Sequence, residues 1–127
     1  MTRILTISLA LAAMALIPTT ALAKHGGDRG KTVSGNCTGS ATSKLKVKPD
    51  NGRLETEFEV DQNRNGVKWS VTMKRNGKTA VSTTARTKAP SGSFSVERRL
   101  ANGDGKDKIS ARAKSSSGQV CTASLSI

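Results

Sequence analysis

The side chains of this sequence that could do chemistry are mainly basic. The chain holds 21 Lys and Arg against 9 Asp and Glu, a formal net charge of +12 with His neutral. A positive field of this size attracts anions and makes their binding sensitive to salt. Nucleophilic catalysis is harder to build, because His25 is the only histidine and lies in a glycine-rich stretch that cannot position it. We therefore expect a protein that is not an enzyme and needs no cofactor.

One polar loop has part of a metal-binding pattern. Residues 61–66 match the first six positions of a calcium loop, D-x-N-x-N-G. The bidentate glutamate of such a loop would fall on Thr72, and Arg64 would repel a cation. Asp, Asn and Gly are also the residues preferred in turns, so we expect an ordinary loop at this position and no metal site.

The start of the chain has the pattern of a secretory signal peptide over residues 1–23. Arg3 precedes an apolar run at residues 4–17, and a small-residue cleavage site ends at Ala23. The apolar run is too short to cross a bilayer, which needs about 20 apolar residues. We expect a secreted, extracellular protein, either free or associated with the cell surface.

The rest of the chain is long enough for one small domain. Residues 24–39 predict a flexible arm, and residues 40–127 predict the domain. Cys37 and Cys121 lie near the two ends of the exported product, where oxidation is permitted. We expect them to form one disulfide that pins the arm and stabilises the fold by about 4.5 kcal/mol in the chain-entropy treatment.

Seven short segments carry their apolar residues at alternate positions, the period of a strand with one buried face. The clearest segment holds the only tryptophan, Trp69, and leads into an Asn76-Gly77 hairpin turn, since these two residues best tolerate positive φ. Seven strands separated by frequent turns indicate an all-β, two-sheet sandwich. The strands are expected at residues 44–48, 53–60, 67–74, 78–87, 93–99, 108–114 and 119–127.

The first two strands predict a hairpin closed by a four-residue loop at residues 49–52. In that register opposite charges meet on one face and apolar residues meet on the other. The expected charged pairs are Lys46 with Glu55 and Lys44 with Glu57.

The strand at residues 78–87 has no clear phase. A two-residue turn would place Ala80 opposite Met73 and leave Val81 on the wrong face. We expect a bulge or an edge strand at this position.

The apolar content is low for a folded domain. Leu, Ile, Val and Phe make up about 15% of the residues after Ala23, a range associated with disorder when net charge is high. A largely disordered chain is therefore an alternative. The regular alternation and the expected disulfide favour a folded β domain instead.

Several features resemble those of immunoglobulin and fibronectin type III domains. They are Trp69 in the third strand, the Asn76-Gly77 hairpin, SFSVERR at residues 93–99 and DKISARAKSSSGQVC at residues 107–121. The stretch from Gly35 to Cys121 is also similar to small secreted proteins of actinobacteria. The chain departs from the pattern because it has no tyrosine for the corner of the sixth strand, and because its cysteines lie before the first strand and on the last.

The resemblance implies a single seven-stranded antiparallel sandwich of immunoglobulin or fibronectin type III type. One sheet would contain the strands at 44–48, 53–60 and 93–99, and its outer face would balance lysines against glutamates. The other sheet would contain the strands at 67–74, 108–114 and 119–127, and its outer face would carry cations and hydroxyls without an acid. The candidate anion-binding residues are Lys68, Lys74, Arg75, Lys78, Lys108, Arg112 and Lys114.

All three aromatic residues fall on inward positions, and no carboxylate does. Stacking on bases or sugar rings is then not available, so sequence-specific nucleic acid binding is not expected. We expect a monomeric, non-enzymatic binding or surface-association module for an anionic partner such as a wall polymer, an acidic polysaccharide or a membrane surface. Two alternatives stay open: a structural domain that binds a protein partner through the edge strand at 78–87, and a charge that serves only solubility.

Overall fold

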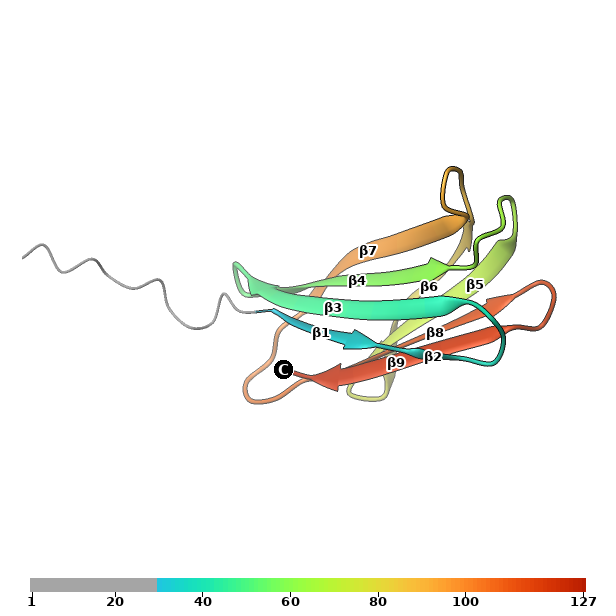
Figure 1. Cartoon of the computed structure of the whole chain (residues 1–127). Helices are drawn as coiled ribbons and strands as arrows, with labels where there is room; N and C mark the ends of the chain where they lie inside the picture. Colours follow the sequence, from blue (N-terminus) through green and yellow to red (C-terminus); the bar gives the residue numbers. More distant parts are fainter. Residues whose placement is uncertain (1–29) are drawn as a thin grey trace, which may run out of the picture.

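The computed structural model describes residues 30–127, so the expected signal peptide and His25 lie outside the described residues. Within this range nine β-strands form two antiparallel sheets packed as a sandwich (Figure 1). The predicted all-β sandwich is confirmed, but with nine strands in place of seven. The strands are β1 (Lys31–Ser34), β2 (Asn36–Cys37), β3 (Thr42–Asp50), β4 (Arg53–Asp61), β5 (Lys68–Arg75), β6 (Lys78–Arg86), β7 (Ser93–Ala101), β8 (Lys108–Ser115) and β9 (Val120–Ser126).

The two sheets have the orders β1-β3-β4-β7 and β2-β9-β8-β5-β6. In Figure 1 β3 and β4 of the four-stranded sheet lie above β9 of the five-stranded one. The segments expected to share a sheet do so, since β3, β4 and β7 are together and β5, β8 and β9 are together. β5 and β8 are neighbours, which is the relationship a common basic face requires. No helix among residues 30–127 is long and apolar enough to cross a membrane.

The two additional strands lie in the segment expected to be a flexible arm, which is a correction for residues 31–37. β1 pairs with β3 at the edge of the four-stranded sheet, and β2 pairs with β9 at the edge of the other. The chain changes sheet at Gly35, whose N–H donates to the Ser43 carbonyl at 2.9 Å. A Cβ at Gly35 would collide with the Ser43 hydroxyl and the Thr122 carbonyl, so the crossing has room only for glycine. Long-range pairing orders this segment, and its local pattern carries no sign of it.

The disulfide is present and joins Cys37 to Cys121, 84 residues apart. The two residues are direct partners in the β2–β9 pair. The bond therefore links the start of the described chain to its last strand, which confirms the predicted bridge. A disulfide in this position is consistent with an oxidising compartment.

The β3–β4 hairpin corrects the predicted register by two residues. The turn has two residues, Asn51 and Gly52, with φ of 49° and 73°, in place of the expected four-residue loop. β3 and β4 extend to the turn because this pair tolerates the left-handed region. Lys46 consequently faces Glu57. The other charged pairs of the hairpin are Lys44 with Glu59 and Lys48 with Glu55.

The β5–β6 hairpin confirms both expectations for the strand at 78–87. Asn76 and Gly77 have φ of 50° and 82° at the turn. The register shifts between Met73 and Lys74, which brings Val81 opposite Met73 and leaves its side chain only 9% exposed. The bulge thus corrects the phase of β6, which is the edge strand of its sheet.

The core is small and fully enclosed between the sheets. Phe58 of β4 and Trp69 of β5 have no exposed surface, and the rings of Trp69 and Phe94 lie 5.9 Å apart across the two layers. The indole N–H of Trp69 donates to the Gln62 side-chain oxygen at 3.0 Å. Because nearly every large apolar residue points inward, the low apolar content still fills a continuous core.

Candidate anion-binding face

The five-stranded sheet contains no Asp or Glu in any of its strands. Most of its inward positions are apolar, with Ser115 a buried exception, and its outward positions carry Lys, Arg, Ser and Thr except at Val120 of β9. We call the outward surface of β5, β6, β8 and β9 the basic face. Its exposed cations are Lys68, Lys74, Arg86, Lys108, Arg112 and Lys114.

The strand register surrounds these cations with hydroxyl groups. Arg112 of β8 lies between Thr72 of β5 and Thr122 of β9. Lys74 and Lys114 have serine partners, Ser110 and Ser70 respectively. Each of these cations therefore has at least one neighbouring hydroxyl that donates a hydrogen bond to an anion, although the other neighbour of Lys114 is Val120. No carboxylate of the described strands of this sheet competes.

The basic face is hollowed at one end. The hollow has a volume of about 600 Å³ and lies over β5, β8 and β9, beside the segment where the chain changes sheet. Three cations line it: Lys74, Lys108 and Arg112. Its other polar lining residues are Ser34, Asn36, Thr72, Ser110, Thr122 and Ser124.

Five of the predicted anion-binding residues share this face: Lys68, Lys74, Lys108, Arg112 and Lys114. The other two lie at the β5–β6 turn, where Arg75 and Lys78 are paired in the register. Arg75 also pairs with Ile109, an inward position, and its side chain is only 28% exposed.

Arg86 belongs to the basic face and is absent from the sequence-based set. It pairs with Lys68 across β5 and β6 and is exposed. The bulge sets which residues of β6 point outward. Without the bulge, the two-residue turn would place Arg86 on the inward side, so the sequence pattern alone does not assign it to this face.

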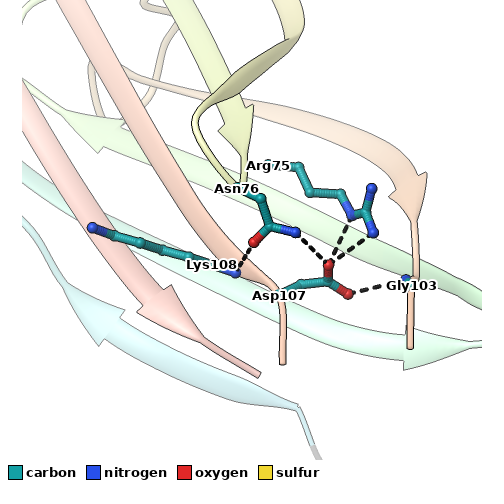
Figure 2. A network of polar contacts seen from close by, with 5 residues as sticks. All are labelled: Arg75, Asn76, Gly103, Asp107 and Lys108. Atoms are coloured by element: carbon teal, nitrogen blue, oxygen red, sulfur yellow. Dashed lines mark hydrogen bonds and ion pairs between the residues drawn. The ribbon is translucent and has the colours of Figure 1, made fainter. Parts of the chain in front are cut away.

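The acid that engages Arg75 is Asp107, the residue immediately before β8 (Figure 2). Its side chain is nearly inaccessible, with Asp107 only 1% exposed. The prediction that no carboxylate points inward is therefore wrong. The Arg75 guanidinium lies 2.8 Å from the Asp107 Oδ1, and the Asn76 amide and the Gly103 N–H donate to the same carboxylate at 2.9 and 3.1 Å.

Burial by itself raises the pKa of Asp107. The hydrogen bonds from Asn76 and Gly103 and the charge of Arg75 lower it more strongly, and the net pKa lies below the ordinary range of an aspartate. A carboxylate that is ionised and fully hydrogen-bonded holds structure together and is a poor proton donor.

The Asp107 network also holds the backbone of Lys108, a lining residue of the hollow. Asn76 and Lys108 exchange two hydrogen bonds of 2.8 Å, one from each backbone N–H (Figure 2 shows the one donated by Lys108). The backbone of Asp107 exchanges two more with Ile127 at the C-terminus. The turn after β5, the start of β8 and the end of β9 are thereby tied together around Lys108.

The outer face of the four-stranded sheet has a different charge pattern. Its lysines on β3 are each opposite a glutamate on β4, and Arg99 forms an ion pair with Asp50 at 3.0 Å. Glu57 and Glu97 face each other between β4 and β7. Burial, the hydrogen bond with Glu97 and the charges of Glu97 and Glu59 raise the pKa of Glu57, against a smaller opposing effect of Lys46. Mixed charge makes this face a poor site for a polyanion.

Within the described range, no group of three or more His, Cys, Asp or Glu is arranged to hold a metal ion. In the loop at residues 61–66 the Asp61 carboxylate accepts a hydrogen bond from the Asn63 N–H at 3.0 Å. Asn63 and Gly66 have positive φ. The side-chain hydrogen bond and the positive φ angles are those of an ordinary turn at residues 61–66.

Comparison of the chain with protein-family models, with curated proteins and with solved structures finds no match.

Proposed function

We propose that this chain is a secreted, non-enzymatic binding module, with a sandwich of immunoglobulin or fibronectin type III type, whose basic face holds an anionic extracellular partner. The signal-peptide pattern at residues 1–23 and the Cys37–Cys121 disulfide support export. The grouping of β3, β4 and β7 in one sheet and β5, β8 and β9 in the other supports the fold type.

The hollow on the basic face carries the proposal. Three cations and several hydroxyls line a space of about 600 Å³, and none of the described residues that line it carries a carboxylate. Pockets of this volume accommodate a small ligand or a segment of a polymer. Cations left without acidic neighbours keep their full field for a ligand, whereas those on the opposite sheet lie beside glutamates.

The position of the aromatic residues narrows the class of partner. Phe58, Trp69 and Phe94 are all buried, so the face offers no ring on which a base or a sugar could stack. Recognition then depends on charge and on hydrogen bonds to oxyanions. A wall polymer, an acidic polysaccharide or an anionic surface meets this requirement, and a specific nucleic acid sequence does not.

Retention on immobilised heparin and on immobilised polyphosphate tests the proposal. The basic-face variant changes Lys68, Lys74, Arg112 and Lys114 to Ser. The matched control changes Lys44, Lys46, Lys48 and Arg53 to Ser, so both variants lose four positive charges. We expect the basic-face variant to elute at clearly lower salt than the control. Each cation that contacts the polyanion contributes to its affinity, so removing contacting cations weakens binding more than removing cations elsewhere. Equal elution of the two variants would refute the proposed face.

A second candidate is binding of a protein strand at β6. β6 has nine residues and ends its sheet, so its outer edge has no partner strand within the described residues. The bulge and the cations Lys78 and Arg86 at its ends are features that protect edges from pairing. Capture of a partner that withstands high salt and is lost in Ala80→Pro, at the unpaired bulge position, would favour this function.

A further inference from the structure

We infer that the basic face binds a linear polyanion bearing phosphate or sulfate groups, extended along β8 from the hollow to the opposite end of the sheet. This inference rests on the proposed function and specifies the ligand of the same face. It follows from how the register distributes the cations, which differs from the compact arrangement expected around a single small anion.

The cations of β8 lie in a row. Lys108, Arg112 and Lys114 occupy outward positions of one strand. Outward positions recur about every 6.8 Å in an antiparallel strand, so Lys108 and Lys114 are separated by about 20 Å. That separation exceeds the Debye length of about 8 Å at physiological salt, and a small anion at one end gains little from the charge at the other.

The neighbouring strands widen this row at the hollow and extend it at the other end. At the hollow, Lys74 of β5 lies opposite Ser110, between Lys108 and Arg112 of β8. At the other end Ser70 lies opposite Lys114, so Lys68 falls beyond it, paired with Arg86. The face thus has a hollow cluster (Lys74, Lys108 and Arg112) and a far cluster (Lys68, Arg86 and Lys114). Arg112 and Lys114 are adjacent outward positions and make the two clusters continuous.

The groups between the cations suit the oxyanions of a polymer backbone. Hydroxyls flank Arg112 on both sides, and Lys114 has Ser70 beside it. Phosphate and sulfate groups offer several strong acceptor oxygens to such donors. A membrane surface is less well matched, because the face is hollowed and the half-buried Val120 is the one large apolar side chain at an outward position of the described strands β5, β6, β8 and β9. No aromatic ring is available there to enter the headgroup region.

Binding of polyphosphate fractions and heparin fragments of increasing length, measured by calorimetry at low salt, tests the inference. The wild-type chain is compared with a hollow variant (Lys74→Ser, Lys108→Ser, Arg112→Ser) and a far variant (Lys68→Ser, Arg86→Ser, Lys114→Ser). Lys44→Ser, Lys46→Ser, Lys48→Ser serves as the control of equal charge. Tryptophan fluorescence verifies that each variant keeps Trp69 buried.

We expect wild-type affinity to rise with chain length and to level off when a chain spans the row from Lys108 to Lys68, about 27 Å at about 3.4 Å per residue. The hollow variant should weaken binding of both triphosphate and long chains. The far variant should weaken long chains about tenfold and leave triphosphate within about twofold. Preference for polyphosphate or for heparin decides between phosphate and sulfate, and either result supports the linear ligand.

Three results would count against the inference. If the far variant binds long chains as tightly as wild type, the ligand is compact and only the hollow is used, which leaves the proposed function intact. If anionic vesicles bind more tightly than every soluble polymer, the partner is a membrane surface. If wild type binds no polyanion at all, the proposed function itself fails.

Discussion

The Arg75 guanidinium lies 2.8 Å from the buried carboxylate of Asp107, and this contact joins the end of β5 to the start of β8. It removes one cation from the set available to a ligand. It also anchors the turn that holds Lys108 at the hollow. A structural ion pair and a binding surface are therefore built from adjacent positions on the same two strands.

Replacing Asp107 by Asn should lower the free energy of unfolding by about 2 kcal/mol. The change removes the charge that Arg75 neutralises and weakens the acceptor for Asn76 and Gly103. Urea denaturation followed by Trp69 fluorescence measures the effect. Asp104→Asn is the matched control, because Asp104 is exposed in the same loop and should change stability by less than about 0.5 kcal/mol. Equal effects of the two substitutions would show that the network does not stabilise the fold.

The same carboxylate predicts how stability depends on acid. The pKa of Asp107 is lowered on folding, so its contribution is complete above its ordinary pKa of about 3.9 and is lost as pH falls through the lower folded value. Urea midpoints of wild type should drop below about pH 4 more steeply than those of Asp107→Asn. Parallel pH profiles of the two proteins would contradict the assignment.

Replacing Glu97 by Gln should stabilise the protein at neutral pH by about 0.5 kcal/mol. Glu57 and Glu97 are direct partners, and like charges placed opposite each other on a sheet are unfavourable. The gain should fade as pH falls through the raised pKa of Glu57, because protonation there already relieves the repulsion.

Glu55→Gln is the control for this change. Glu55 lies between Lys48 and Arg99, so its replacement removes favourable charge pairs and should have the opposite sign. Thermal unfolding at pH 7 and at acid pH measures both variants. A loss of stability in Glu97→Gln at neutral pH would contradict the prediction.

Removing the disulfide by Cys37→Ala with Cys121→Ala should lower the free energy of unfolding by about 4.5 kcal/mol, since the bridge closes an 84-residue interval. Reduction of the wild-type protein should have a similar effect on the urea midpoint. A lean core makes this loss large relative to the total stability of a small domain. An unchanged urea midpoint after verified reduction would mean that the disulfide does not contribute to the stability of the sandwich.

Replacing Gly35 by Ala should destabilise the fold by about 2 kcal/mol, because the added methyl group meets the Ser43 hydroxyl and the Thr122 carbonyl where the chain changes sheet. Gly39→Ala is the comparison, since the nearest atoms to its methyl group belong to the Gln119 side chain, which can move away at the cost of its hydrogen bond from the Ala41 N–H. Urea denaturation should separate the two variants clearly. If both behave as wild type, the crossing is less tightly packed than the structure has it.

The strands and the inner faces were predictable because their signal is local. Alternation of apolar and polar residues around Trp69 and Phe58 identifies which side chains must be buried, whatever strand lies next to them. The Asn76-Gly77 turn and the Cys37–Cys121 bridge were predictable for similar reasons: a turn needs particular residues, and two cysteines in an oxidised protein have one partner each.

The candidate site was only partly accessible from sequence. The phase of β5 and β8 predicted that Lys74, Arg112 and Lys114 point outward, and the resemblance to immunoglobulin-type sandwiches implied that the two strands share a sheet. Arg75 was assigned there too, although a partner 32 residues away engages it. Arg86 was missed because one bulge changes the phase of β6.

By itself, then, the sequence determined seven of the nine strands of the described residues, the buried face of each of these except β6, and that β5, β6, β8 and β9 contain no acid. Only the tertiary structure decided the β3–β4 register, the two strands around Gly35, the burial of Asp107 and the hollow beside Lys108. The first set depends on the periodicity of a single strand, which neighbouring residues encode directly. The second depends on backbone angles at a turn and on contacts between distant segments, whose free energies exist only once both sheets are assembled.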